Sequence, residues 1–221
     1  MEKRLQIAKS LLEKRKFHEV IRKCNEILIE NQESKHALKI LAKALIEIKK
    51  IKEAIIILNR VLYLNSKDYE VLKDLGNAYQ VIGDIETARK YYQDSLLINN
   101  KYASALTNLG IIETISGNGE KGLELLIQAT INDSKLCKAW KNLSISYIRY
   151  KRLEEAKHAI LKAIELEPNH YDLHYLLGTI LIRKNKIKEA KSHLIKTIKL
   201  KPDFADAYSN LGNILKDLGE S

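Results

Sequence analysis

The sequence of 221 residues contains only two prolines and nine glycines. Proline lacks the backbone N–H that a helix needs, so its scarcity leaves long stretches free to be helical. Hydrophobic residues make up 45% of the chain and charged residues 30%, which is typical of a mostly helical, soluble protein. The length suffices for one sizeable domain or two small ones.

Long apolar runs are missing as well. The longest is Ala54–Leu58, whereas a membrane-spanning helix needs ~18 consecutive apolar residues. The N-terminal stretch, Met1 to Leu5, is charged and lacks the apolar core of a signal peptide. We therefore expect a cytoplasmic protein without a transmembrane segment.

Cysteine is equally scarce. Cys24 and Cys137 are separated by several predicted helices, which pack at ~8–10 Å spacing. A disulfide requires Cα atoms within ~7 Å, so we expect both thiols to stay reduced. No Cys/His cluster has the spacing of a zinc site, and no phosphate loop or catalytic triad is present. We therefore expect no enzyme activity, no cofactor and no metal.

What the sequence does have is a repeat of 34 residues that runs from residue 1 without a gap. The repeats are 1–34, 35–68, 69–102, 103–136, 137–170 and 171–204, followed by a partial repeat, 205–221. The eighth position is always small: Ala8, Ala42, Gly76, Gly110, Ser144, Gly178 and Gly212. The twentieth position is also mostly alanine or glycine. Two small columns predict two helices that cross closely within each repeat.

The stretch Cys137–His170 is the best-formed copy. Trp140 and Tyr147 lie at helical spacing, Ala156 and Ile160 do so on a second helix, and Pro168 stops it. One hairpin cannot bury both of its faces, so neighbouring repeats must stack, which predicts thirteen helices.

These residues carry a family resemblance. The positions concerned are Trp140, Leu143, Tyr147, Ala156, Ala163 and Pro168, with Leu75, Gly76, Tyr79 and Ala88 in the third repeat. They resemble the tetratricopeptide repeat signature over the whole chain. The resemblance implies an all-α fold, a right-handed α-solenoid of six 34-residue helix-turn-helix repeats plus one extra C-terminal helix, as a single domain of residues 1–221. It also implies a concave groove, lined by the first helices, that binds extended peptides or partner helices.

Two segments depart from the pattern. In the fourth repeat Glu113 replaces an aromatic or leucine, and glycines surround the turn at 116–122, so we expect this hairpin to be soft. It is either a drifted repeat or a hinge. At the end, residues 205–221, with Tyr208, Leu211 and Leu218, form a first helix without its partner. This helix is either a cap or the sign of a longer repeat protein.

His170 and His174 come closest to a metal site, because they lie four residues apart. However, His170 falls in a predicted turn, and His174 occupies the slot that Trp140 holds in the fifth repeat. Packing is the better interpretation, and we expect no metal site.

The formal net charge of +10 raises the question of a nucleic-acid partner. The resemblance assigns the second, fifth, sixth, ninth, twelfth and thirteenth positions to the groove, where nine basic residues face eight acidic ones. A groove that follows a phosphate backbone would be far more lopsided, so nucleic acid is an unlikely partner. The excess charge gathers at 183–201, which is either a solvated face or a site for an anionic surface.

Two patterns of groove residues suggest peptide binding. Lys73, Asn77, Asn108 and Lys138 resemble the carboxylate clamp by which some tetratricopeptide domains hold the free C-terminus of a chaperone, although the fifth clamp position is Asn142. Asn108, Asn142 and Asn210, interrupted by Leu176, instead resemble an asparagine ladder that grips a peptide backbone.

We therefore predict a non-catalytic protein–protein interaction scaffold that binds an extended peptide or partner helix. The candidate binding residues are Lys73, Asn77, Asn108, Lys138, Lys141, Asn142 and Arg149. The lysines and the arginine would meet acidic side chains or a free C-terminus, and the amides would hold backbone. Two alternatives remain: the substrate-recruiting part of a larger glycosyl- or sulfotransferase, and an adaptor for a chaperone C-terminus.

Overall fold

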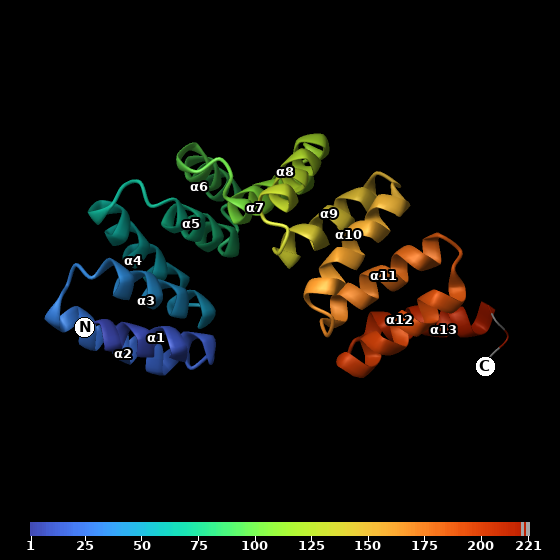
Figure 1. Ribbon diagram of the computed structural model, residues 1–221, viewed down its shortest axis with the longest axis horizontal. Helices are drawn as coiled ribbons and strands as arrows, with labels where there is room; N and C mark the ends of the chain where they lie inside the picture. Colours follow the sequence, from blue (N-terminus) through green and yellow to red (C-terminus); the bar gives the residue numbers. More distant parts are fainter. Residues whose placement is uncertain (218, 220–221) are drawn as a thin grey trace. The chain divides into compact units, whose positions relative to one another are not determined.

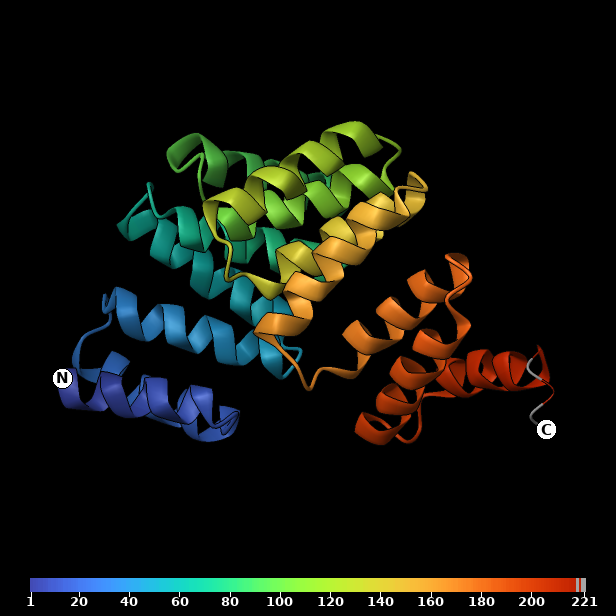
Figure 2. The ribbon, with the colours of Figure 1, turned by 45° about the vertical axis from the view of Figure 1, so that its right-hand side comes forward.

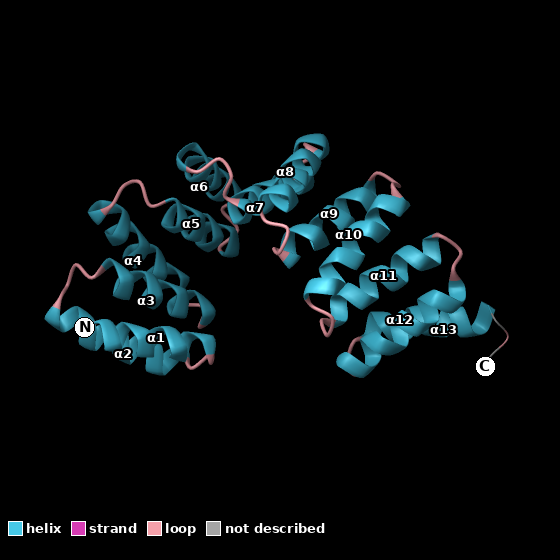
Figure 3. Ribbon diagram, viewed as in Figure 1, coloured by secondary structure: helices cyan, strands magenta, loops and turns pink. Residues whose placement is uncertain are grey.

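The computed structural model describes residues 1–217 and Gly219, and this part of the chain contains thirteen α-helices and no strand (Figure 1 and Figure 3). The first helices of the repeats are α1 (Glu2–Glu13), α3 (Lys35–Glu47), α5 (Tyr69–Val81), α7 (Ala103–Ile115), α9 (Cys137–Arg149), α11 (Tyr171–Arg183) and α13 (Ala205–Asp217). The second helices are α2 (Phe17–Glu30), α4 (Ile51–Leu64), α6 (Ile85–Ile98), α8 (Gly119–Asn132), α10 (Leu153–Leu166) and α12 (Ile187–Leu200). The predicted solenoid of six hairpins and one extra helix is confirmed. The predicted contribution of Leu218 to the last helix falls outside the described residues.

Every hairpin turns at the same repeat position. The fifteenth residue of each repeat has a positive φ, between 56° and 92°: Arg15, Lys49, Gly83, Gly117, Lys151 and Asn185. The following residue donates its N–H five residues back, as from Lys16 to the Leu11 carbonyl at 3.0 Å and from Arg152 to the Tyr147 carbonyl at 2.9 Å. This is the Schellman ending of a helix, which satisfies carbonyls that would otherwise lack a donor.

The second helices end as regularly. The residue after each of them, except Glu167 after α10, is extended. At Asn31, Asn65, Asn99 and Asp133 its side-chain oxygen accepts the N–H two residues on, at 3.0–3.4 Å. Such an Asx turn breaks the helix and starts the next repeat. Pro168 and Pro202 follow α10 and α12 as predicted.

The small columns are required by close helix crossings. A Cβ atom on Gly76 would lie 2.5 Å from the ring of Tyr92, and one on Gly122 would lie 2.7 Å from the Gly110 carbonyl oxygen. Gly122 therefore marks an especially tight crossing of α7 and α8. In the same hairpin Glu113 is fully buried, and it accepts hydrogen bonds from Asn118 at 2.7 Å and Lys121 at 3.2 Å. The predicted softness of this hairpin remains a prediction.

The chain divides into two compact units, Met1–Asn108 and Leu109–Ser221, here called the N-terminal and the C-terminal unit. Within each unit, helices that follow one another in the chain pack together, as α1, α2 and α3 do in Figure 2. The core of the N-terminal unit includes Cys24, Leu58 and Leu75. That of the C-terminal unit includes Ile160 and Leu177.

Both cysteines are buried free thiols. Burial raises the pKa of Cys24 to about 12 and that of Cys137 to about 11, so both stay protonated at neutral pH and are poor nucleophiles.

Among the described helices, none combines the length and the apolar character that crossing a bilayer requires. The cytoplasmic location remains a prediction from the sequence.

Candidate functional site

The predicted binding residues fall into two groups, one in each unit. Lys73 and Asn77 on α5 and Asn108 on α7 belong to the N-terminal unit. The other four are Lys138, Lys141, Asn142 and Arg149, all on α9 in the C-terminal unit. Each group is therefore described by itself.

In the N-terminal unit, Asn77 and Asn108 are brought together by a hydrogen-bond network. The Asn77 Oδ1 atom accepts from Asn108 Nδ2 at 2.7 Å and from the hydroxyl of Tyr92 at 2.8 Å, and that hydroxyl also lies 3.0 Å from Gln80 Oε1. Tyr92 is fully buried, and burial raises its pKa well above the usual range. Since the oxygen of Asn77 is occupied, its NH2 group is the part that can donate to a peptide carbonyl.

Lys73 is already neutralised within the chain. Its ammonium contacts the carboxylate of Asp74, and the two side chains are only 15% and 7% exposed. Burial alone would lower the pKa of Lys73, but the charge and the hydrogen bond of Asp74, together with the charges of Tyr102 and Glu70, outweigh burial and raise it. A carboxylate clamp needs a lysine that is free to meet a terminal carboxylate, so this pair disfavours the clamp interpretation.

Lys39, one repeat earlier, is bound in the same way. Its Nζ atom lies 2.6 Å from Glu70 and 3.2 Å from Asp68. The N-terminal unit thus neutralises both lysines at the fifth repeat position with its own carboxylates.

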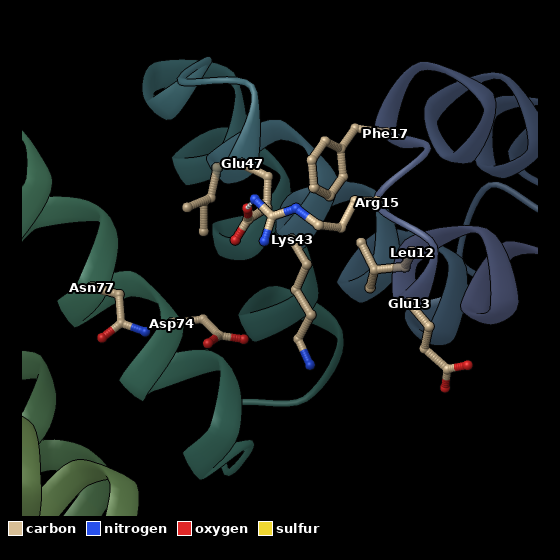
Figure 4. A pocket seen from close by; sticks show the side chains of 9 residues that line it. Leu12, Glu13, Arg15, Phe17, Lys43, Glu47, Asp74 and Asn77 are labelled. Atoms are coloured by element: carbon tan, nitrogen blue, oxygen red, sulfur yellow. Dashed lines mark hydrogen bonds and ion pairs between the residues drawn. The ribbon is translucent and has the colours of Figure 1, made fainter. Parts of the chain in front are cut away.

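A cleft of about 460 Å³ opens beside these residues (Figure 4). Its lining comes from three successive repeats: Leu12, Glu13, Arg15, Phe17, Lys43, Ile46, Glu47, Asp74 and Asn77. In Figure 4, Asp74 and Asn77 on α5 lie on one side, Arg15 and Glu47 lie together on the other, and Lys43 reaches between them. Arg15 pairs with Glu47 at 3.3 Å, whereas Lys43 is exposed and makes no ion pair with a described residue. Among the cleft's cationic side chains, Lys43 is therefore the one available to a ligand.

In the C-terminal unit, the four predicted residues differ in how much of their hydrogen-bonding and charge-pairing capacity is already used within the chain. Lys141 pairs with Asp172 at 2.9 Å, and Lys138 also has a partner. Asn142 donates through Nδ2 to the Lys138 carbonyl at 2.8 Å. Arg149 is exposed and makes one long hydrogen bond, 3.3 Å, to the Thr114 carbonyl. Arg149 thus keeps most of its hydrogen-bonding capacity.

Asn142 and Arg149 border a small cleft of about 90 Å³ between α7, α8 and α9. Its other lining residues are Ile111, Thr114, Ile115, Leu126, Ile145 and Ser146. The apolar lining was missed by the sequence analysis, although Ile111 and Ile145 occupy the groove-facing ninth position. Two isoleucines at the same groove-facing position of neighbouring repeats were the signal that the sequence offered.

The histidines of the candidate metal site are used in other ways. His174 is buried, its Nε2–H donates to the Pro168 carbonyl at 2.9 Å, and its Nδ1 lies 3.1 Å from Nδ1 of His193. His170 contacts Asp172. No group of three potential metal ligands occurs among the described residues. The packing interpretation of His174 is confirmed by its burial.

Part of the basic segment at 183–201 is also paired internally. Lys184 contacts Glu154, Lys186 lies 3.2 Å from Glu189, and the ammonium of Lys201 lies 4.7 Å from the ring centre of Tyr171. These pairs reduce the charge that the segment offers to a partner.

The stacked hairpins and the clefts between their first helices define a helical-repeat protein. The tetratricopeptide repeat models match residues 70–102, 137–170 and 159–192, and a TPR repeat model matches 178–219. The chain belongs to the tetratricopeptide repeat family. It is accordingly a protein-interaction scaffold, a class whose members are generally non-catalytic.

Solved structures show the same fold at low sequence identity. The Cut9–Hcn1 hetero-tetramer of APC/C matches with 19% identity and a TM-score of 0.90 over 96% of this chain, which spans 42% of that chain. YrrB, a TPR protein with an unusual peptide-binding site, matches with 20% identity and a TM-score of 0.60, covering 84% of this chain and 96% of its own. The Pseudomonas aeruginosa protein pilF matches with 16% identity and a TM-score of 0.78, covering 86% of each chain. No curated protein matches the chain in sequence.

Proposed function

We propose that this protein is a non-catalytic scaffold that binds an extended peptide segment or partner helix along its first helices. The observation that carries the proposal is the cleft of the N-terminal unit, because α1, α3 and α5 from three successive repeats line it. A ligand that follows the cleft contacts one hairpin after another. An extended backbone suits such a site, since it presents side chains and peptide groups at regular intervals.

The chemistry of the lining supports a peptide rather than a small metabolite. Leu12, Phe17 and Ile46 offer apolar surface, while Lys43 and the NH2 group of Asn77 offer donors. Apolar surface gives affinity, and a few placed polar groups fix orientation. YrrB, a TPR protein with an unusual peptide-binding site, is consistent with this use of the fold.

The seven predicted residues keep separate roles in this proposal. Asn77, Asn108 and Asn142 hold peptide backbone, and Arg149 and the lysines Lys138 and Lys141 meet acidic groups. Lys73 neutralises the carboxylate of Asp74, which lines the cleft, and so does not itself bind the ligand's acidic groups. Because Lys73 is neutralised, we favour binding along an extended segment over capture of a free C-terminus.

The test is a charge reversal in the cleft with a matched control. Peptides are selected from a random displayed library on the full chain, and their affinities are measured by fluorescence anisotropy. We expect Lys43→Glu to lower the affinity of peptides that bind this cleft by about tenfold or more, because the glutamate repels the acidic groups that the lysine attracts. Lys90→Glu makes the same change at an exposed position of the second helix α6 and should leave affinity unchanged.

A double variant, Asn108→Ala with Lys138→Ala, tests the predicted residues directly. Wild-type affinity in this variant would show that the partner binds elsewhere. Failure of the wild-type chain to select any peptide would contradict the proposed function itself.

A further inference from the structure

The small cleft of the C-terminal unit has an apolar interior and one cationic edge. Its interior is formed by Ile111, Ile145 and the buried Leu126, and Ile115 stands at its rim with 56% of its surface exposed. At about 90 Å³ it is well below the ~300–1,000 Å³ of small-molecule sites, so it fits a single side chain. We expect an apolar residue to enter, because four of the eight lining residues, Ile111, Ile115, Leu126 and Ile145, are aliphatic. The hydroxyl of a fifth, Thr114, already donates to the Gly110 carbonyl at 2.7 Å.

Arg149 supplies the cationic edge. Its guanidinium donates to the Thr114 carbonyl at 3.3 Å, and no carboxylate of a described residue forms an ion pair with it. Since a guanidinium has five N–H donors in a planar fork, it can still hold a carboxylate with two parallel hydrogen bonds.

Asn142 completes the edge with a group that binds backbone. Its Nδ2 atom uses one hydrogen for the Lys138 carbonyl at 2.8 Å. The second hydrogen and the amide oxygen remain for a peptide C=O and N–H. The cleft therefore combines an apolar interior with two groups on α9, the Asn142 amide that can bind a peptide backbone and the Arg149 guanidinium.

The surrounding charges decide which ligand this arrangement prefers. In the N-terminal unit, Lys39 and Lys73 are each held by carboxylates of the chain, so an acidic ligand would have to displace an existing partner. Arg149 requires no such exchange. An acidic residue thus gains more at Arg149 than at either of those two lysines.

We infer that the C-terminal unit binds a peptide segment in which an aliphatic side chain enters this cleft and an aspartate or glutamate within about two residues of it pairs with Arg149. This inference rests on the proposed peptide-binding function and names the class of segment that the second cleft takes. The aliphatic residue gives affinity by removing the exposed surface of Ile115 from water. The acidic residue fixes the register, because it must reach a guanidinium at one end of the cleft.

The test uses the full chain and a random displayed peptide library as the probe. Wild type should select sequences in which leucine, isoleucine, valine or methionine lies close to aspartate or glutamate. Arg149→Glu should replace that acidic preference with lysine or arginine and weaken the wild-type peptides by about tenfold or more. Arg149→Lys should keep the acidic preference with lower affinity, because it preserves the charge but not the planar fork.

Two further variants complete the design. Lys188→Glu makes the same charge change at an exposed residue of α12 and should select the same sequences as wild type. Ile111→Ala enlarges the cleft and should shift the aliphatic preference toward larger side chains while the acidic preference stays.

The outcomes separate this inference from the function on which it rests. If peptides bind but carry no acidic preference, or if Arg149→Glu leaves that preference unchanged, the inference is overturned while peptide binding stands. If wild type and Ile111→Ala select the same aliphatic residues, the aliphatic side chain does not enter this cleft, and the inference is overturned. If no peptide binds the wild-type chain, both the inference and the proposed function fail.

Discussion

The first helices α1 and α3 of the N-terminal unit end in Glu13 and Glu47, whereas α9 and α11 of the C-terminal unit end in Arg149 and Arg183. The C-terminal end of a helix carries partial negative charge, so arginine is favourable there and glutamate is not. Of these two glutamates, only Glu47 forms an ion pair with a described residue, Arg15 at 3.3 Å. The N-terminal unit therefore keeps carboxylates at positions where they do not help the helix, which points to a role at the cleft that Glu13 and Glu47 line.

This difference shows why an average over the whole groove misleads. The sequence count of groove charges is close to neutral, nine basic against eight acidic. The structure separates that sum into a unit whose Lys39 and Lys73 are paired with its own acids and a unit that leaves Arg149 without an ion pair to a described carboxylate. A partner with both basic and acidic segments would find a different preference in each unit.

The largest expected effect comes from breaking the pair that neutralises Lys73 in the N-terminal unit. Asp74→Asn should lower the free energy of unfolding by about 2–3 kcal/mol, because it leaves the ammonium of the half-buried Lys73 without its counter-charge. The same change should raise affinity for acidic peptides at the N-terminal cleft. Chemical denaturation and fluorescence anisotropy measure the two effects.

Asp84→Asn is a matched control for Asp74→Asn. Asp84 is an exposed N-cap of α6 in the same unit, and asparagine caps a helix about as well as aspartate. If Asp74→Asn destabilised the chain no more than this control, the charge comparison between the units would lose its basis.

The next effect concerns the tight crossing in the C-terminal unit. Gly122→Ala should destabilise the chain by about 1–3 kcal/mol, because the added Cβ would lie 2.7 Å from the backbone oxygen of Gly110. Helix propensity alone predicts the opposite sign, a gain of about 1 kcal/mol. Thermal and chemical denaturation decide between the two.

Gly212→Ala is the control for this change, since a Cβ there meets nothing within 4 Å. It should stabilise α13 by about 0.5–1 kcal/mol. A stabilising Gly122→Ala would support the soft hairpin expected from glycine content.

The glycines show which features of the fold could be predicted from the sequence and which could not. The small eighth and twentieth columns predicted close crossings, and Gly76 against Tyr92 confirms one of them. The fold was predictable because one repeated pattern constrains every hairpin alike. Gly122 belongs to the small twentieth column, so its close crossing follows from the same prediction, but the sequence also counts it among the glycines that soften the hairpin. Which of these two effects on stability is larger could not be predicted, since both come from the same missing side chain.

The candidate site was predictable only in part. The groove-facing positions of Asn77 and Asn108 follow from the repeat, and these two side chains do meet. The pairing of Lys73 with Asp74 could not be foreseen, because adjacent residues of a helix normally point in different directions. The same holds for Tyr92, whose hydroxyl reaches Asn77 from another helix.

A smaller effect tests what the two units share. Both units turn their hairpins through a left-handed residue, and Lys49 and Lys151 fill this position with φ of 64° and 57°. Lys49→Gly and Lys151→Gly should each stabilise the chain by about 0.5–1 kcal/mol, because glycine adopts this conformation without strain and this gain exceeds its larger entropy loss. Denaturation midpoints measure both changes.

Equal gains would show that the units differ in charge but not in hairpin geometry. The reverse substitution, Gly83→Ala, should destabilise by a similar amount, since φ at Gly83 is 86° and no other atom lies close enough to matter. A loss of stability in either lysine variant would contradict the common turn.

The last prediction is a pH dependence confined to the C-terminal unit. Burial lowers the pKa of both His174 and His193 below the usual 6.5, and the charge of Lys196 acts in the same direction. Because His174 donates through Nε2 to the Pro168 carbonyl, its neutral form must accept from His193 at Nδ1, and protonation removes that acceptor. The unfolded chain binds these protons more readily, so stability is fully present above about pH 6.5 and falls as the pH drops below it.

Hydrogen exchange resolved to individual helices, corrected for intrinsic rates, should therefore show α11 and α12 losing protection between pH 7.5 and 5.5. Helices α1 to α4, whose His18 and His36 are exposed, should change less. His174→Gln keeps a donor for the Pro168 carbonyl and should flatten the dependence, whereas His18→Gln should not. A uniform loss of protection across both units would show that overall charge, and not the buried histidine pair, governs the response to acid.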